Sequence, residues 1–363
     1  MVVLAVALGG IALGSAGCGG NNSSSSSGKS SAKPTNGADA AGKRFLDRYV
    51  TPDGRVQRID QGGDTVGEGQ AYGMLIAAAI GDSKRFDSIW GWTKDNLRRK
   101  DGLISFLWRD GKVQDPQAAS DADVDAARAL LVAACRFHRP ALRKEAVGLA
   151  EAVLTKETAQ SQGQPVLVAG PWAVKKPITV NPSYFSPATF AALTSTTGDG
   201  KWGSLAASSR SITDALLQGQ SKLPPDWARI EGDKPAPSGP PDNPQGTPQF
   251  GFDAVRTFVR MAEDPDPAGR EIAARSWPVF EGQDPGNLPV EHDLTGKPTG
   301  GTMSPVVLVS AAGAADAAGK AADRDRFLDA AEALDTRSPT YYGAAWVALG
   351  RIMLTTDELK SCS

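Results

Sequence analysis

Three acidic residues stand where apolar helical patterns begin, positions at which a carboxyl group can do proton chemistry. The first is Glu68, one turn before Tyr72 on the apolar stripe of a predicted helix. Desolvation on that stripe favours the protonated carboxyl that a general acid needs. The partial positive charge of the helix N-terminus favours the carboxylate instead. The local pattern therefore leaves two interpretations open: a general acid, or a residue that only neutralises the helix dipole.

The second acidic group is Asp121, Asp123 and Asp125, which opens the next strongly helical segment. Ser120 is a good N-cap, and Asp123 completes a near capping box, which gives Asp123 a structural role. A calcium loop is the alternative, since the three acids have its first ligand spacings, but Ala126 stands where that loop requires Gly. We therefore predict that Asp121 belongs to a functional site.

The third acid is Asp253, which follows a long Pro- and Gly-rich segment at the start of another predicted helix. Arg256 lies one turn later, and its guanidinium and the helix dipole both favour the ionised carboxylate that a general base requires. N-capping is the alternative role for Asp253. A protonated carboxyl beside an ionised one is the working arrangement of a glycosidase, so these acids point to glycoside hydrolysis.

The composition narrows the classes of partner and site. The chain has 363 residues and a formal net charge of −2, without a basic stripe, which argues against nucleic acid as a partner. His138 and His292 are too few and too far apart for a His-rich zinc site. The cysteines give no disulfide framework, and their spacing leaves open whether Cys135 and Cys362 pair.

The first 38 residues are predicted to be a leader and a tether. Residues 1–18 resemble a bacterial signal peptide of the lipoprotein type, with an apolar run followed by Cys18 as the lipidated residue. Plain secretion is the alternative, and either route predicts an extracellular location or the outer face of the cell membrane. Residues 19–38 are mostly Gly, Asn, Ser and Lys, which predicts a flexible linker. Residues 39–363 are the predicted catalytic domain.

From residue 39 onward the pattern predicts an all-α fold. Roughly a dozen helical patterns are joined by Gly and Pro loops, with little strand signal. A bundle, a solenoid or a closed ring of helical hairpins fits this count, and the lack of a fixed repeat argues against the solenoid. Residues 224–249 and 282–301 exceed ordinary loop length, so each is either a binding surface or a disordered insertion. The tryptophans predicted to lie in the core are Trp90, Trp92, Trp277 and Trp346.

Several short blocks together resemble glycoside hydrolase family 8, the endoglucanase and bacterial cellulase family. Their shared order and spacing cover residues 43–354, nearly all of the predicted folded part. The matching blocks are Gly67-Glu68-Gly69-Gln70-Ala71-Tyr72-Gly73-Met74, Ala119-Ser120-Asp121-Ala122-Asp123, Asn181-Pro182-Ser183-Tyr184, Pro225-Asp226-Trp227, Phe252-Asp253-Ala254-Val255-Arg256 and Tyr341-Tyr342. Two positions depart from the family pattern: Gly67 replaces a Ser, and Phe252 replaces a Tyr.

The resemblance implies an (α/α)6 barrel, six inner helices ringed by six outer ones, and a reaction that needs no metal or organic cofactor. It also implies that Glu68 is the general acid, that Asp253 is the general base, and that Asp121 holds the sugar between them. Inversion would place the acid and base carboxyls roughly 6.5–9.5 Å apart, whereas retention would place them about 5 Å apart. We expect a monomer that cleaves β-1,4-glucan chains internally, with mixed-linkage glucan, chitosan and xylan as the other substrates handled within the family.

Aromatic side chains are the expected platforms for the apolar faces of sugar rings. The predicted substrate-binding residues are Trp108, Trp172, Tyr184 and Trp227, together with Tyr72 and Arg256. Two other functions stay open. A non-catalytic glycan-binding lipoprotein would need neither acid nor base, so the presence of both Glu68 and Asp253 argues against it. A helical-barrel polysaccharide lyase would use a Tyr or His base beside an acidic sugar.

Overall fold

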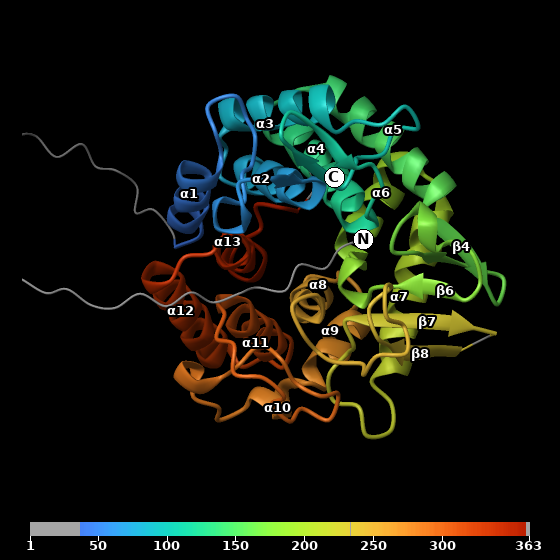
Figure 1. The fold of residues 1–363 in the computed structure, drawn as a ribbon, viewed down its shortest axis with the longest axis vertical. Coiled ribbons are helices and arrows are strands. Elements are labelled where there is room, and N and C mark those ends of the chain that lie inside the picture. Colours follow the sequence, from blue (N-terminus) through green and yellow to red (C-terminus); the bar gives the residue numbers. More distant parts are fainter. Residues whose placement is uncertain (1–36, 233, 361–363) are drawn as a thin grey trace, which may run out of the picture.

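The structure is a computed structural model that describes residues 37–232 and 234–360. Within these residues, six helices pack side by side in a closed ring (Figure 1). Each contacts the next one named here, and the last contacts the first. In order they are α2 (Gly67–Ala79), α4 (Ser120–Arg136), α6 (Pro187–Thr197), α8 (Thr257–Ala262), α11 (Pro305–Ala317) and α13 (Tyr341–Thr355).

An outer helix packs on each inner one. The outer helices of the described part are α1 (Gly37–Tyr49), α3 (Ser83–Asn96), α5 (Pro140–Lys156), α7 (Gly200–Leu216), α9 (Pro267–Ala274) and α12 (Ala321–Arg337). They contact α13, α2, α4, α6, α8 and α11, respectively. This pairing is the (α/α)6 barrel, and the all-α prediction is confirmed.

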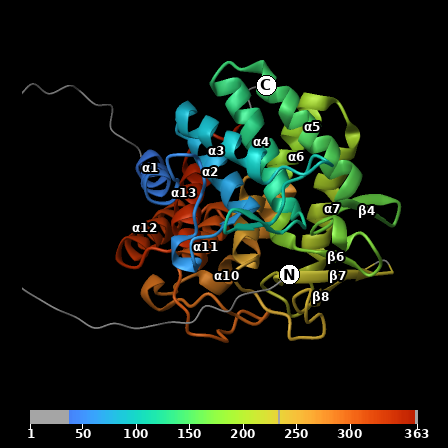
Figure 2. The ribbon, with the colours of Figure 1, turned by 45° about the horizontal axis from the view of Figure 1, so that its top comes forward.

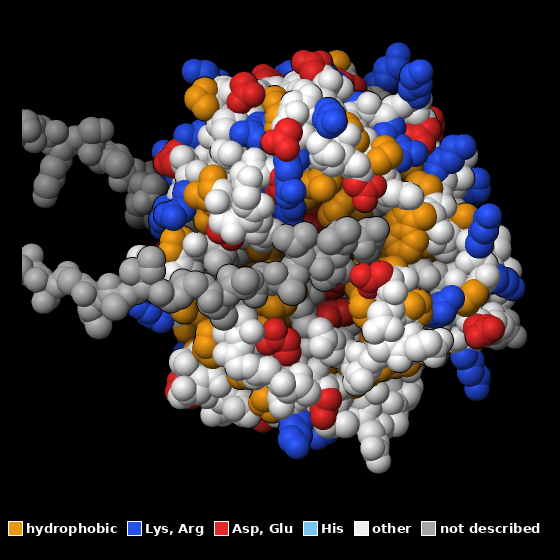
Figure 3. All heavy atoms as spheres, viewed as in Figure 1, with side chains coloured by type: hydrophobic (Ala, Val, Ile, Leu, Met, Phe, Trp, Pro, Cys, Tyr) orange, Lys and Arg blue, Asp and Glu red, His pale blue; other side chains and the backbone are white. Residues whose placement is uncertain are grey.

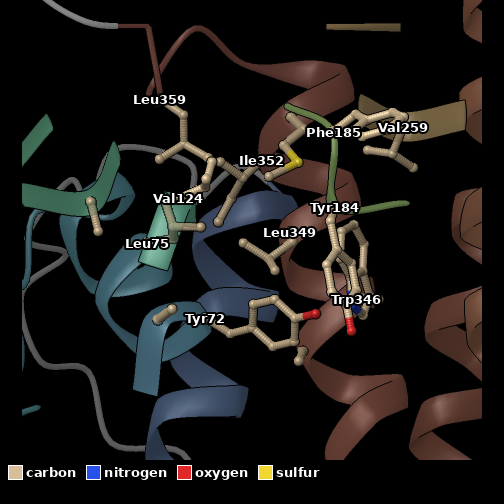
Figure 4. Packing of buried hydrophobic residues seen from close by; sticks show 14 of the residues in the cluster. Tyr72, Leu75, Val124, Tyr184, Phe185, Val259, Trp346, Leu349, Ile352 and Leu359 are labelled. Carbon is tan, nitrogen blue, oxygen red and sulfur yellow. The ribbon is translucent and has the colours of Figure 1, made fainter. Parts of the chain in front are cut away.

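The inner helices α2, α11 and α13 are buried on nearly every side, because their sequences are apolar and rich in small residues. Glycine lets them approach closely: a Cβ at Gly69 would lie 2.5 Å from the hydroxyl of Tyr341 on α13. Tyr72 of α2 reaches across to Trp346 of α13, with ring centroids 5.6 Å apart (Figure 4). The four tryptophans predicted to lie in the core are all buried.

Strands are more frequent than the sequence indicated, and they lie outside the ring. One sheet joins β1 (Thr65–Val66), β2 (Leu107–Arg109) and β3 (Lys112–Asp115); a hairpin joins β4 (Thr158–Ser161) and β5 (Gln164–Leu167); a third sheet joins β6 (Ile178–Val180), β7 (Trp227–Glu231) and β8 (Lys234–Ser238). Figures 1 and 2 show this third sheet at the edge of the ring. The segment 224–249 is therefore partly a β-hairpin, and its prolines Pro235 and Pro237 lie on the edge strand, where no ladder donor is needed.

α9 ends at Ala274, and α10 (Trp277–Phe280) begins anew with Pro278 in its first turn. One predicted boundary differs from the structure. Gly37 and Ala38 belong to α1, so the predicted linker is wrong for these two residues. The leader with Cys18 and the rest of the linker lie outside the described residues. None of the helices in the described ranges is long and apolar enough to cross a membrane.

Candidate active site

The inner helices begin at one end of the barrel, where the predicted catalytic acids meet. Arg256 lies fully buried at their centre. Its Nη1 donates to Asp121 Oδ2 at 2.8 Å and to the hydroxyl of Tyr72 at 3.0 Å, and it lies 3.7 Å from Glu68 Oε2. Its Nη2 donates to Asp253 Oδ1 at 2.8 Å. One guanidinium thus joins three acids that are far apart in the sequence, with Asp253 on one nitrogen and Glu68 on the other.

Glu68 occupies the first turn of α2, as the sequence predicted. The strand β1 directly precedes it and pairs with β2, and Gly67 N donates to Phe106 O at 2.9 Å. These bonds fix the entry of the chain into α2. The side chain of Glu68 remains 21% exposed, so its carboxyl is accessible to a ligand.

Asp121 lies at the start of α4 and is 1% exposed. Burial and the negative charge of Glu68 raise its pKa to about 7, against the lowering effect of the Arg256 guanidinium. A carboxyl in this balance changes protonation near neutral pH and can both donate to and accept from sugar hydroxyls.

Asp253 occupies the N-cap position of its own helix but does not cap it through its side chain. It precedes the 3-10 helix η4 (Ala254–Arg256), yet its side chain makes no capping bond and is 33% exposed. The cap is Asp226 instead, which accepts from the backbone N–H groups of Asp253 at 3.2 Å and Ala254 at 2.7 Å. The carboxyl of Asp253 is therefore directed to Arg256, which corrects the capping interpretation.

Several groups set the ionisation of Asp253. Burial raises its pKa, and the negative charge of Asp121 adds to this effect. Arg256 lowers the pKa, as do hydrogen bonds from the side chains of Asn181 and Trp227. Arg256, Asn181 and Trp227 thus favour the ionised carboxylate of Asp253, whereas burial and Asp121 favour the protonated form.

Asp123 also differs from the prediction. The N-cap of α4 is Ala119, and Asp123 Oδ1 accepts instead from Ile104 N at 2.9 Å, so the capping-box interpretation is wrong. The bond ties the segment before β2 to α4. Deeper in the protein, Glu157 is fully buried and the negative charge of Asp123 raises its pKa. Within the described part, neither carboxyl oxygen of Glu157 has a hydrogen-bond partner.

Glu157→Gln is expected to make stability less dependent on pH. Burial raises the pKa of Glu157 well above 4.5, so the folded protein keeps a proton that the unfolded chain loses above that pH. Through this window the free energy of unfolding falls by about 1.4 kcal/mol per pH unit. The melting temperature should therefore fall less steeply between pH 5 and pH 8 in the variant than in the wild type. The exposed Glu271→Gln is the control. Parallel curves would contradict this.

Three of the predicted platform residues form one aromatic cluster. The Trp227 ring lies 6.0 Å from that of Tyr184 and 6.5 Å from that of Trp172. Arg256 packs over the Tyr184 ring at 5.1 Å, which joins this cluster to the acids. Trp172 keeps the most exposure of the three, while Tyr184 and Trp227 are largely buried.

Trp108 lies apart from this cluster, on β2. Its ring packs against the edge of Trp92 at 5.3 Å, and the guanidinium of Arg55 lies over it at 5.1 Å. The adjacent Arg109 donates to the buried Asp64 at 2.6 Å, which anchors this strand beside the segment that leads to Glu68. Tyr72 is fully buried, and its hydroxyl accepts from Arg256 Nη1. It therefore supports Arg256 and exposes no ring face to a ligand.

Two residues at the site were not singled out from the sequence. Asp226 and Asn181 appear there only as members of matching blocks, without a role. Asn181 directly precedes the 3-10 helix at 182–184 and Asp226 directly precedes β7, and only the tertiary structure brings them to Asp253. The sequence signal for each was local: Asn181 directly precedes Pro-Ser-Tyr, and Asp226 directly precedes Trp227.

The surface around the barrel mouth and its far end differ in character. In the space-filling view, acidic and hydrophobic side chains gather near the middle of the face, and Lys and Arg lie mostly toward its periphery (Figure 3). A cavity of about 1030 Å³ lies at the C-terminal ends of α8 and α13. Its charged residues are paired, as in Arg128 with Glu263 and Arg324 with Asp316. Within 37–232 and 234–360, no three His, Cys, Asp or Glu side chains are placed to share a metal ion.

Comparison with known proteins gives one consistent result. The model for glycosyl hydrolases family 8 matches residues 26–346. A probable endoglucanase from Novacetimonas hansenii is 33% identical over 222 residues, which cover 58% of this chain and 63% of that protein. An endoglucanase from Cellulomonas uda is 29% identical over 229 residues, which cover 60% of this chain and 62% of that protein. The chain thus spans less than two thirds of the length of these two relatives.

Solved structures agree in fold. An endo-β-1,4-glucanase from Acetobacter xylinum superposes with a TM-score of 0.73 at 28% identity, over 87% of this chain and 97% of that one. A β-1,3-1,4-glucanase from Paenibacillus sp. X4 superposes with a TM-score of 0.78 at 18% identity, over 90% of this chain and 92% of that one. The second likeness concerns the fold alone.

Proposed function

The chain belongs to glycoside hydrolase family 8, and from this premise we propose that it is an endo-acting hydrolase of β-1,4-glucan chains. The observation that carries the proposal is the arrangement around Arg256. Glu68 and Asp121 lie beside its Nη1, and Asp253 accepts from its Nη2. Two accessible carboxyls flanking one buried charge are the parts that glycoside hydrolysis requires.

In the proposed reaction, Glu68 donates its proton to the glycosidic oxygen as the bond from that oxygen to the anomeric carbon breaks. Asp253 takes a proton from a water molecule, whose oxygen forms the new bond to the anomeric carbon from the opposite face. Asp121 binds hydroxyls of the sugar between them. Arg256 keeps a positive charge beside both aspartates throughout.

The experiment that tests the function compares four polymers. Release of reducing ends and loss of viscosity are measured on soluble carboxymethyl cellulose, mixed-linkage β-glucan, chitosan and xylan. Endo cleavage of β-1,4-glucan predicts a rapid fall in viscosity for few new ends. No release from any polymer by folded protein would favour a non-catalytic glycan-binding protein, and products with an unsaturated end would identify a lyase.

The products are expected to show inversion at the anomeric carbon. Because a single displacement by water reverses the configuration, a β-1,4-glucan should first yield α-anomers. Proton NMR of a short cellooligosaccharide during hydrolysis reads this directly, before mutarotation equilibrates the anomers. Initial β-anomers would contradict the proposed roles of the two carboxyls.

The acid limb of the pH–activity profile is expected to lie above the ordinary aspartate pKa of 3.8. Asp253 must be ionised to act as the base, and burial raises its pKa, so activity is lost as the pH falls through that raised value. The profile of kcat/KM on an uncharged mixed-linkage glucan measures the limb, with thermal unfolding at each pH as control. A limb at or below pH 3.8 would contradict the assignment.

For location, we propose a lipid-anchored or secreted protein, supported by the apolar run before Cys18. Expression in a bacterial host with labelled palmitate, beside Cys18→Ser, separates the two routes. Label in the wild type alone indicates an anchor; label in neither, with protein in the medium, indicates secretion.

A further inference from the structure

The carboxyl of Asp226 gathers the backbone on which Asp253 stands. Its Oδ1 accepts from Gly251 N at 2.9 Å, from Asp253 N at 3.2 Å and from Ala254 N at 2.7 Å. Asp226 itself is 9% exposed. Three donors that converge on one buried oxygen fix the turn 251–254 with charge-assisted hydrogen bonds, which are stronger than neutral ones.

This capping from a distance releases the side chain of Asp253. An aspartate at an N-cap usually folds back onto the N–H groups of its own first turn. Here Asp226 accepts from two of those groups, and Asp253 makes no such bond. The carboxyl of Asp253 is therefore free to reach Arg256 Nη2 at 2.8 Å and to keep an exposed edge.

The surroundings of Asp226 are built for this close approach. A Cβ at Gly251 would lie 2.5 Å from Asp226 Oδ2, so only glycine fits at that position. Asp226 N donates to Gln249 O at 2.7 Å, and the Gln249 amide approaches Asp226 Oδ2 at 3.4 Å. The next residue is Trp227, whose side chain hydrogen-bonds to Asp253. The dipeptide Asp226-Trp227 thus binds both the backbone and the side chain of Asp253.

We propose that Asp226 is a positioning residue for the base, one that holds the turn 251–254 so that the Asp253 carboxylate stays directed to Arg256 with one edge exposed. This inference rests on the proposed function. Asp226 acts through Asp253 and touches neither the water nor the sugar.

Charge links the two aspartates as well. Burial and the negative charge of Asp253 raise the pKa of Asp226 to about 7, although hydrogen bonds from Ala254 N and Gly251 N lower it. The other ionisable groups that face Asp253 are Arg256 on η4, Asp121 on α4, Tyr184 on η3 (Pro182–Tyr184) and Tyr342 on α13. Below about pH 7 the Asp226 carboxyl is mostly protonated, so a neutral amide at this position should leave the acid limb of activity in place.

Two substitutions separate geometry from charge. Asp226→Asn keeps an oxygen that can accept from the three N–H groups but removes the charge. Asp226→Ala removes both. Displacement of a catalytic group by about 1 Å costs on the order of 10²-fold in rate, so Asp226→Ala should lower kcat by that order with KM nearly unchanged. Asp226→Asn should retain most of kcat and leave the acid limb where it lies in the wild type.

The control is Asp284→Ala. Asp284 caps η5 (Pro285–Asn287), another short 3-10 helix, by accepting from Gly286 N at 3.0 Å. Loss of that cap should leave kcat and the pH profile unchanged. Circular dichroism and thermal unfolding establish that each variant is folded before its rate is compared.

A readout independent of activity completes the test. Hydrogen exchange at the amides of Gly251, Asp253 and Ala254 should accelerate in Asp226→Ala and much less in Asp226→Asn. Faster exchange with wild-type kcat in Asp226→Ala would overturn the positioning role and leave a purely structural one. Unchanged exchange in Asp226→Ala would overturn the inference as well. If the wild type hydrolyses none of the polymers, the proposed function fails, and the exchange rates still report whether Asp226 holds this turn.

Discussion

Glu68→Gln is expected to lower kcat on soluble β-1,4-glucan by about 10²–10⁴-fold, the usual contribution of a general acid, with KM close to that of the wild type. Glutamine has the shape of glutamic acid but has no acidic proton to give to the leaving oxygen. Glu68 lies 3.7 Å from Arg256 and is partly exposed, so the neutral side chain should fit without disturbing the barrel. Reducing-end assays at saturating and limiting substrate measure both parameters.

The control for this variant is Glu271→Gln, the same exchange at an exposed position of α9. An activated aryl cellobioside adds a second comparison, because its leaving group needs little protonation. The loss in Glu68→Gln should be much smaller on that substrate. An equal loss on both substrates would argue that Glu68 binds or orients the sugar without donating a proton.

Asp253→Asn is expected to cost a similar factor, about 10²–10⁴-fold in kcat, on the polymer and on the activated substrate alike. Water must lose a proton whichever group leaves, so a better leaving group does not compensate for a missing base. The variant keeps Arg256 paired with Asp121 at 2.8 Å, which should preserve the fold. Steady-state rates on both substrates test this.

Asp95→Asn, an exposed exchange on α3, is the matched control for the base variant. The contrast between substrates is the discriminating result. Rescue of Asp253→Asn by the activated substrate would assign Asp253 to leaving-group chemistry and so contradict its role as the base. Together the two variants test whether the acids on either side of Arg256 have different tasks.

The sequence predicted where these acids lie more readily than how they are held. Glu68, Asp121 and Asp253 each precede an apolar helical pattern, and that local feature survives in the structure. Arg256 was paired with Asp253 because they lie one turn apart. Its bond to Asp121, 135 residues away, depends on helix packing that no local pattern encodes.

Capping was the least reliable inference, for a physical reason. Short polar side chains satisfy helix N–H groups equally well from within the helix or from a distant segment. Asp253 and Asp123 look like caps in sequence. In the structure, the side chain of Asp226 caps the helix after Asp253, and Asp123 accepts from Ile104 N instead. The hairpin within 224–249 was missed likewise, because its prolines are compatible with a strand only once an edge position is assigned.

The proposed catalytic acids lie at one end of the barrel only, which leaves the other end free for attachment of the protein to a label or a support. The acids lie where α2, α4 and η4 begin, whereas Lys360 lines the cavity at the C-terminal end of α13 and is largely exposed. A fluorophore or a solid support coupled through Lys360 would leave the path of a polymer chain open. Enzyme fixed to a bead in this orientation should digest long chains as readily as enzyme in solution, whereas coupling through the rim of the acid-bearing end would not.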